Sequence, residues 1–144
     1  MTNNDLVGAY AISKAVLPHM RSRKSGNIVF TGSMASFFAM PRVAAYAVAK
    51  NGVWGLIRNF AFETATDGIR VNGIAPGYID NTGIFKEATV NDPERYQRIV
   101  SRIPSHILGE PGDIGWATVY LCSPAAKYVN GHMLVVDGGA SIGF

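Results

Sequence analysis

The chain has 144 residues with a single cysteine, and its formal net charge is +3. Hydrophobic residues make up 48% and charged residues 16%, which is typical of a globular protein with a sizeable core, and one cysteine excludes an internal disulfide framework. No run approaches the ~18 uninterrupted apolar residues of a membrane helix, and the N-terminus lacks a secretory pattern. We therefore expect a single domain over residues 1–144 of a soluble, cytoplasmic protein with no membrane partner.

The basic residues are scattered, apart from a cluster of Arg21, Arg23 and Lys24. A nucleic-acid footprint would need a basic stripe with interleaved aromatics, so we expect no nucleic-acid partner. The cluster is interpreted as the solvated end of a helix, where cations suit the helix dipole.

The first half of the chain predicts a helix, a strand and a second helix. Residues 6–20 repeat apolar side chains at helical spacings, and Ser25-Gly26 closes this helix. The run 27–31 is β-branched, lies between glycines and predicts a buried strand, and residues 32–43 predict a loop. Residues 44–65 predict a helix that is apolar nearly all round and is therefore buried on more than one side. Gly68 fits its stop signal.

The second half continues this alternation. Residues 69–75 predict a strand that Pro76-Gly77 ends, and residues 78–110 predict a long polar excursion with a candidate helix at 93–101. Residues 111–121 predict a helix, and residues 133–137 predict a third strand. Continuously hydrophobic strands that alternate with helices predict an α/β fold, with a parallel sheet covered on both faces. About three strands would leave an apolar edge unpaired, which indicates that part of the fold is missing.

Tyr46 and Lys50 give the strongest chemical signal. Positions i and i+4 lie on one helix face, so the phenol and the ammonium can address the same point. A nearby cation favours the phenolate form of a tyrosine, which can then exchange a proton with a carbonyl or alcohol oxygen. Ser33 follows the first predicted strand, and ligands bind at the carboxyl ends of strands in open α/β sheets. Each signal alone also fits an ordinary helical pair or a turn serine.

Four segments change this balance when they are taken together: Gly-Asn-Ile-Val-Phe-Thr-Gly-Ser at 26–33, Ala-Tyr-Ala-Val-Ala-Lys at 45–50, Ile-Arg-Val-Asn-Gly-Ile-Ala-Pro-Gly-Tyr-Ile at 69–79 and Val-Val-Asp-Gly-Gly at 135–139. In order and spacing they resemble the second half of a classical short-chain dehydrogenase/reductase. The resemblance runs over essentially the whole chain. It implies the C-terminal half of a Rossmann-type doubly wound parallel sheet, without the N-terminal nucleotide-binding half.

The resemblance also implies a role for each matching residue. Tyr46 would be the general acid/base, Lys50 would assist Tyr46 and bind the nicotinamide ribose, and Ser33 would hold the substrate oxygen. The implied activity is NAD(P)-dependent interconversion of an alcohol and a carbonyl, on a small-molecule substrate that we expect to be apolar. The positions implied to flank the nicotinamide are Pro76, Gly77, Ile79 and Thr82. The family's usual threonine would fall on Asn81, one residue before Thr82.

Two departures from the family matter. An asparagine usually opens the helix before the serine strand and completes a proton relay; Asp5 stands at that position, and its charge would alter the relay. The glycine-rich loop whose amides hold the cofactor pyrophosphate, and the residue that selects NAD or NADP, have no counterpart in these 144 residues. We therefore expect this chain alone to bind either cofactor weakly. A catalytically impaired interaction module and a truncated gene product remain alternatives.

The remaining residues predict less. Met34, Phe37, Phe38 and Met40 follow Ser33 and are interpreted as a substrate wall, with core packing as the alternative. The three histidines have no ligand spacing and predict no metal site. Cys122 lies in an apolar stretch and predicts buried packing.

Assembly is expected to be homodimeric or homotetrameric. The predicted helix at 44–65 would have an apolar face, including Val53, Ile57 and Phe60, without a partner in the chain, and exposed apolar patches mark association surfaces. Two-fold pairing is the commonest solution for identical chains, and the resemblance implies pairing of this helix with its copy. We therefore predict a dimer through residues 44–65 and 6–20.

Overall fold

The computed structural model describes residues 3–90 and 92–142, and a parallel sheet lies at its centre. The strands are β1 (Gly26–Thr31), β2 (Ile69–Pro76) and β3 (Met133–Val136), in the spatial order β1-β2-β3. The register aligns Thr31 of β1 with Ile74 of β2, and 133–136 of β3 with 73–76 of β2. The carboxyl ends of the strands therefore meet at one edge of the sheet.

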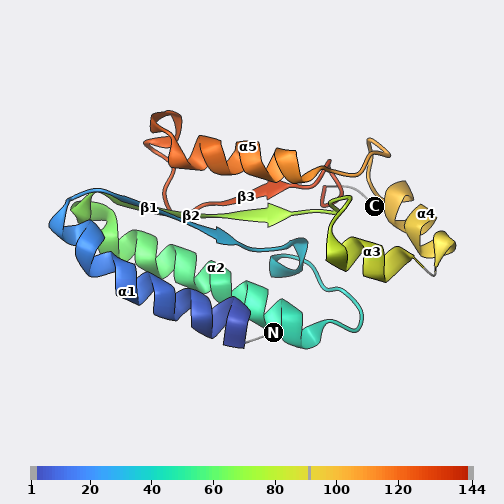
Figure 1. The fold of residues 1–144 in the computed structure, drawn as a ribbon, viewed down its shortest axis with the longest axis horizontal. Coiled ribbons are helices and arrows are strands. Elements are labelled where there is room, and N and C mark those ends of the chain that lie inside the picture. The colour runs from blue at the N-terminus through green and yellow to red at the C-terminus, as the bar shows by residue number, and fades with distance from the viewer. Residues whose placement is uncertain (1–2, 91, 143–144) are drawn as a thin grey trace.

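Helices cover both faces of this sheet (Figure 1). On one face lie α1 (Ala9–Ser22), which a π-helical turn (Asn3–Gly8) precedes, and α2 (Ala44–Thr64); α5 (Pro111–Cys122) lies on the other. The short helices α3 (Gly83–Thr89) and α4 (Pro93–Ser101) lie beyond the carboxyl end of β2. The predicted α/β fold, a Rossmann-like parallel sheet of three strands with flanking helices, is confirmed over the described residues. No described helix is long and apolar enough to cross a membrane.

The main core lies between α2 and the sheet. Val53, Ile57 and Phe60 are at most 5% exposed and pack in one cluster with side chains of β1 and β2. The prediction that this face of α2 lacks a partner is therefore wrong, because the sheet covers it. A helix that is apolar nearly all round gives no periodic cue to its inward face. The apolar side chains that α2 exposes are instead Val48 and Phe62.

Polar side chains on β2 fix its position in the fold. Asn72 is fully buried; its Nδ2 donates to the carbonyl of Val129 at 2.9 Å, and its Oδ1 accepts from the amide of His132 at 3.0 Å. Arg70 donates through Nη2 to the carbonyl of Leu121 at 2.7 Å, at the end of α5. Because a buried polar group without a partner costs free energy, these bonds hold β2 in a fixed relation to α5 and β3.

The observed helices and strands lie within a few residues of the predicted ones, with two corrections. The helix α3 was not predicted, because seven residues give little periodicity; Thr82 caps it by accepting from the amide of Phe85 at 3.3 Å. Cys122 is exposed rather than buried, because its fully buried neighbour Leu121 occupies the inward face of α5. Gly68 has φ 71° and stops the preceding helical segment as predicted.

Candidate active site

A pocket of about 580 Å³ opens where β1 and β2 end. Parallel strands present their carboxyl ends at one edge of a sheet, so residues distant in sequence meet there. Every site residue predicted from the sequence lines this pocket: Asp5, Ser33, Tyr46, Lys50, Pro76, Gly77, Ile79 and Thr82. The structure therefore brings the whole predicted set to one cavity.

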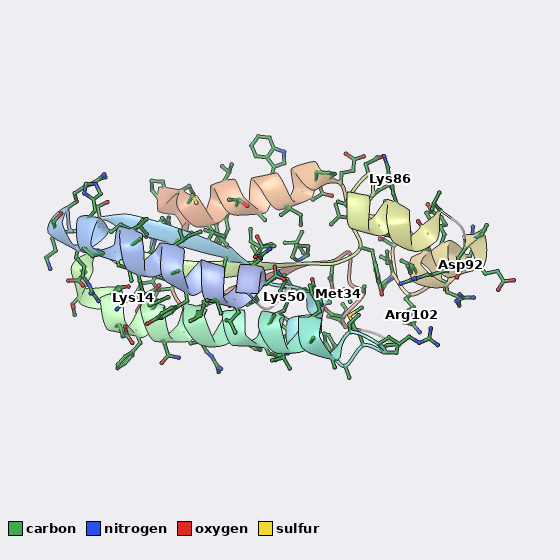
Figure 2. The ribbon with its side chains drawn as sticks, turned by 60° about the horizontal axis from the view of Figure 1, so that its bottom comes forward. Lys14, Met34, Lys50, Lys86, Asp92 and Arg102 are labelled. Atoms are coloured by element: carbon green, nitrogen blue, oxygen red, sulfur yellow. The ribbon has the colours of Figure 1, made fainter. Side chains whose placement is uncertain are left out.

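Lys50 is the most firmly held of these residues. It is 8% exposed, and its Nζ donates to the carbonyl oxygen of Thr31 at 3.0 Å and to Oδ1 of Asp5 at 3.4 Å. A buried ammonium needs such partners, and the carboxylate of Asp5 balances its charge. Figure 2 shows Lys50 beside the start of α1. Because an ammonium has three donors, one N–H group is left for a ligand in the pocket.

Tyr46 lies in the first turn of α2, four residues before Lys50. The Nζ of Lys50 is 5.6 Å from the centroid of its ring, within the range of cation–π attraction. The ring is half-buried, so the phenol remains accessible from the pocket. The i, i+4 spacing thus places the phenol and the ammonium at the same cavity, as the sequence predicts.

Ser33 is oriented by the short 3₁₀ turn that follows β1. Its Oγ caps this turn, Met34–Ser36, by accepting from the amide of Ala35 at 3.1 Å. The turn is joined to α2 by Ser36, whose Oγ donates to the carbonyl of Lys50 at 2.9 Å. Since Oγ of Ser33 accepts a bond from the backbone, its hydroxyl proton is left to donate into the pocket.

The opposite wall is formed by the turn after β2. A Cβ atom on Gly77 would lie 2.6 Å from the Cα of Asp137, so only glycine allows the segments after β2 and β3 to approach this closely. Thr82 caps α3, and its hydroxyl also donates to the carbonyl of Ile79 at 3.0 Å. The hydroxyl of Thr82 is therefore already engaged twice by the protein.

The sequence analysis missed part of the lining. Tyr78, Phe85 and Ile114 also line the pocket, and the carbonyl of Thr31 helps to hold Lys50. Tyr78 directly follows the Pro-Gly turn, and that position is the signal that could have identified it. Phe85 and Ile114 lie on α3 and α5, and no local pattern marks them, because their approach depends on the tertiary fold.

Three of the four residues predicted as a substrate wall line a cavity next to this pocket. Met34, Phe38 and Met40 line an adjoining cavity of about 260 Å³, which Tyr78 also lines. Phe37 does not line it, because its ring packs against Trp54 with the ring centroids 4.5 Å apart. Phe37 therefore belongs to the core side of this loop.

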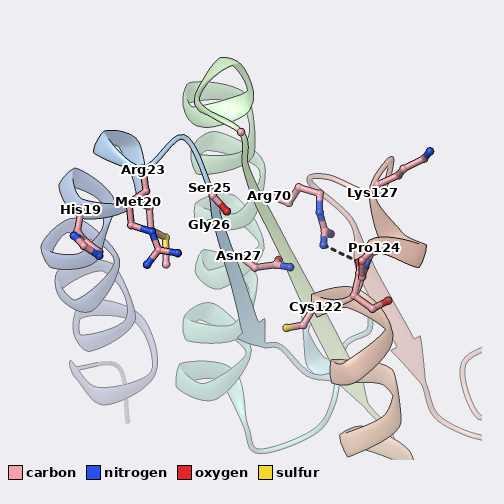
Figure 3. A pocket seen from close by; sticks show the side chains of 12 residues that line it. His19, Met20, Arg23, Ser25, Gly26, Asn27, Arg70, Cys122, Pro124 and Lys127 are labelled. Carbon is pink, nitrogen blue, oxygen red and sulfur yellow. Dashed lines mark hydrogen bonds between the residues drawn. The ribbon is translucent and has the colours of Figure 1, made fainter.

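A pocket of about 470 Å³ lies at the opposite, amino end of β1 and β2 (Figure 3). His19, Arg23 and Cys122 are among the residues that line it. Its most central polar group, Arg70, is committed to the fold, since it also donates to the carbonyl of Ser123 at 3.3 Å. The groups with proton-transfer chemistry are gathered at the other edge, and we place the candidate active site there.

A metal site is absent from the part of the chain that the structure describes. No group of three or more His, Cys, Asp or Glu side chains is placed to hold an ion within 3–90 and 92–142.

Comparison with known proteins defines the class to which this fold and site belong. A family model described as Enoyl-(Acyl carrier protein) reductase matches residues 1–141. The chain is 41% identical over 139 residues to 2-dehydro-3-deoxy-D-gluconate 5-dehydrogenase of Bacillus subtilis (strain 168), covering 95% of this chain and 53% of that protein. It is 39% identical over 137 residues to a 3-oxoacyl-(acyl-carrier-protein) reductase of Vibrio harveyi, covering 95% of this chain and 54% of the relative.

A solved structure shows the same arrangement. The crystal structure of a gluconate 5-dehydrogenase from Burkholderia cenocepacia J2315, in complex with NADP and tartrate, superposes with a TM-score of 0.92 at 33% identity. The match covers 97% of this chain and 54% of that one. The chain belongs to the short-chain dehydrogenase/reductase family, and it spans about half the length of the curated relatives that it matches.

Proposed function

We propose that this protein is an NAD(P)-dependent oxidoreductase that interconverts an alcohol and a carbonyl. The observation on which this rests is the gathering of Ser33, Tyr46 and Lys50 at one cavity beside the Pro76-Gly77 turn. Each of these groups has a chemical task that its surroundings permit. Membership of a family whose curated relatives are named dehydrogenases and reductases supports the same reaction class.

The lining of the cavity fits the nicotinamide riboside end of such a cofactor. Pro76, Ile79 and Phe85 offer an apolar wall for the ring, and Lys50 keeps one N–H group for the ribose hydroxyls. A bound nicotinamide would supply or accept the hydride at the reacting carbon. We propose NAD or NADP as this cofactor; NADP is bound in the gluconate 5-dehydrogenase structure from Burkholderia. To bind the cofactor, the hydroxyl of Thr82 would have to give up one of its two hydrogen bonds, which join it to the carbonyl of Ile79 and the amide of Phe85.

The proton steps are assigned to this chain's own side chains. Ser33 donates a hydrogen bond to the substrate oxygen, which holds that oxygen beside the phenol of Tyr46. Tyr46 gives a proton to this oxygen when a carbonyl is reduced, and takes it when an alcohol is oxidised. Lys50 places its positive charge 5.6 Å from the centroid of the Tyr46 ring. Asp5 acts on Tyr46 only through Lys50 and is therefore a positioning residue.

Replacing Tyr46 with Phe tests this proposal. The substitution removes only the phenolic oxygen, so kcat should fall by roughly 10²–10⁴-fold, as for loss of a general acid/base. Turnover of the best alcohol or carbonyl substrate is followed by nicotinamide absorbance on the protein at its natural length. Tyr128→Phe is the matched control, because that side chain is 99% exposed and lies outside the cavity. If Tyr46→Phe retained more than half of the activity, the assignment of the proton to Tyr46 would be wrong.

We also propose that copies of the chain associate as a homodimer or homotetramer through α1 and α2. The residues that support this differ from those predicted, because Val53, Ile57 and Phe60 face the sheet. Exposed apolar side chains on the two helices are Tyr10, Ile12 and Val16 of α1 and Val48 and Phe62 of α2. The alternative of an interaction module without catalysis would use the same surface and would leave the chemistry of Ser33, Tyr46 and Lys50 unexplained.

A further inference from the structure

A second group of charged side chains lies next to the candidate active site. A pocket of about 590 Å³ is lined by the arginines Arg42, Arg95, Arg98 and Arg102 and, among the side chains that the structure describes, by one carboxylate, Asp92. We call these four side chains the arginine cluster. Figure 2 shows Arg102 and Asp92 on the same side of the molecule, at the end where α3 and α4 lie.

The arginine cluster comes from two separate parts of the chain. Arg95, Arg98 and Arg102 follow one side of α4 and its C-terminal end, at positions i, i+3 and i+7. Arg42 comes from the loop before α2 and has φ 64°, in the left-handed region that favours glycine.

The charge of the cluster is only partly balanced within the described structure. Arg98 makes two ion pairs, from Nη2 to Oδ2 of Asp92 at 3.4 Å and from Nη1 to Oε2 of Glu94 at 3.3 Å. Among the side chains that the structure describes, no carboxylate lies within ion-pairing distance of Arg42, Arg95 or Arg102. Like charges this close repel one another, and an anion in the pocket would relieve the repulsion. The planar guanidinium fork matches a carboxylate in particular.

The pocket adjoins the site proposed for the reaction. Tyr78 lines both the cavity that holds Tyr46 and the pocket of the arginine cluster. Tyr78 and Arg102 also line a third, apolar cavity, together with Met34 and Met40. The three cavities therefore share Tyr78 as a common wall, and a substrate at Ser33 and Tyr46 would have the guanidinium groups as near neighbours.

We propose that Arg102, Arg95 and Arg42 bind the carboxylate of a small-molecule hydroxy acid or oxo acid, which is the substrate of this protein. The inference rests on the proposed function for the reaction, but the anion site is defined by its own residues. It replaces the expectation of a purely apolar substrate with that of an anionic one. Because the arginines are exposed, the attraction is screened by salt and each contributes modestly.

Binding of D-gluconate to the protein at its natural length tests this proposal, with D-sorbitol as the neutral six-carbon counterpart. The titration follows the arginine Nε–H signals by NMR. Gluconate should shift the signals of Arg95 and Arg102 to saturation, and sorbitol should not. Arg102→Gln should weaken gluconate binding about three- to fivefold, and Arg95→Gln with Arg102→Gln about tenfold, as expected for exposed ion pairs. Ionic strength near ~1 M, where the Debye length is about 3 Å, should abolish most of the binding.

Three controls separate the possible failures. Arg58→Gln makes the same change of net charge on α2 and should leave the gluconate affinity unchanged; if it weakened binding as much as Arg102→Gln, only the overall charge would be acting. Arg102→Lys should restore part of the affinity, and backbone amide spectra show whether each variant is folded. The arginine signals report binding without turnover, so a failure of the proposed reaction is distinguishable from a failure of the anion site. Equal binding of gluconate and sorbitol, or unchanged affinity in the double variant, would overturn the proposal.

Discussion

The candidate active site and the arginine cluster lie side by side but are built in opposite ways. Lys50 is nearly buried, is bonded to Thr31 and Asp5, and projects from a helix that packs on the sheet. The four arginines are exposed, and three of them lie on or next to a short helix within the excursion between β2 and α5. The groups proposed to react are thus fixed by the core, whereas the groups proposed to recognise the substrate lie on the surface.

This difference has a physical reason. Proton transfer requires atoms held close to the reacting geometry, which buried and hydrogen-bonded side chains provide. Recognition of a charged group tolerates more movement, because electrostatic attraction depends weakly on orientation and operates through solvent. In this arrangement, changes in the excursion alter what is bound and leave the reaction chemistry unchanged. That is the usual division between a scaffold and its loops.

The largest expected effect is on the free energy of unfolding, and it compares α2 with the excursion. Ile57 of α2 is fully buried against the sheet, so Ile57→Ala should lower the free energy of unfolding by about 2–5 kcal/mol. Ile99 is the buried side chain of α4 and supports the excursion. Ile99→Ala should therefore lower the free energy of global unfolding by less than Ile57→Ala does. It should instead increase hydrogen exchange within 83–103 while the sheet stays protected.

Urea unfolding and hydrogen exchange of the two variants provide the measurement. Tyr128→Ala is the control, because this side chain is 99% exposed, lies outside both regions and should change stability by less than about 0.5 kcal/mol. Equal global losses for Ile57→Ala and Ile99→Ala would contradict the contrast between core and excursion. The excursion would then be as much a part of the cooperative core as α2.

A smaller effect is expected at the charge that balances Lys50. Asp5→Asn keeps the shape of the side chain and removes its charge, which lies 3.4 Å from Nζ of Lys50 and is 30% exposed. The ammonium of Lys50 then keeps a hydrogen-bond acceptor at this position but loses the charge that balances it. Because the pair is partly exposed, kcat for alcohol oxidation should fall only a few-fold, with KM for the substrate nearly unchanged.

Separate measurements of kcat and KM check this, with Glu63→Gln on the exposed side of α2 as the control for net charge. Recovery of kcat in Asp5→Glu, which restores the charge, would support the role of Asp5 as a positioning residue. Equal losses in Asp5→Asn and Asp5→Glu, or a loss in KM alone, would contradict it.

The sequence predicted the rigid region well and the excursion poorly. The strands were recognisable because short β-branched runs are bounded by glycines and proline, and the end of the helical segment before β2 because Gly68 supplies a positive φ. Residues of the candidate site could be proposed because several of them lie at the ends of those strands and Tyr46 and Lys50 have i, i+4 spacing on a helix. These signals are local in sequence. The parallel topology of the sheet brings the residues that carry them together at one cavity.

Tertiary contacts decided what the sequence could not predict. The inward face of α2 was assigned wrongly, since the helix is apolar nearly all round and only packing on the sheet selects Val53, Ile57 and Phe60. Arg42 meets Arg95 and Arg102 across a long stretch of chain, and no local pattern shows that meeting. The spacing of Arg95, Arg98 and Arg102 was visible in the sequence and could have been recognised as one basic helical side.

The smallest expected effect concerns a surface charge far from both regions. Its size indicates how much one surface ion pair contributes, and therefore how much each arginine of the cluster can contribute to binding. Asp67 accepts from Nζ of Lys24 at 2.9 Å and from Nε of Arg21 at 3.0 Å. The hydrogen bond from Lys24, and then the one from Arg21, hold the pKa of the Asp67 carboxyl below its ordinary value of 3.8. A lowered pKa in the folded state means that the ionised form is favoured by folding. Its contribution to stability is therefore fully present above pH ~4 and is lost as the pH falls through the lowered pKa.

Asp67→Asn should lower the unfolding temperature slightly at neutral pH and low salt, and the difference from the parent should vanish in acid and at high ionic strength. Calorimetry at the two pH values measures it, and a difference that persisted in acid would show that Asp67 acts through its shape rather than its charge.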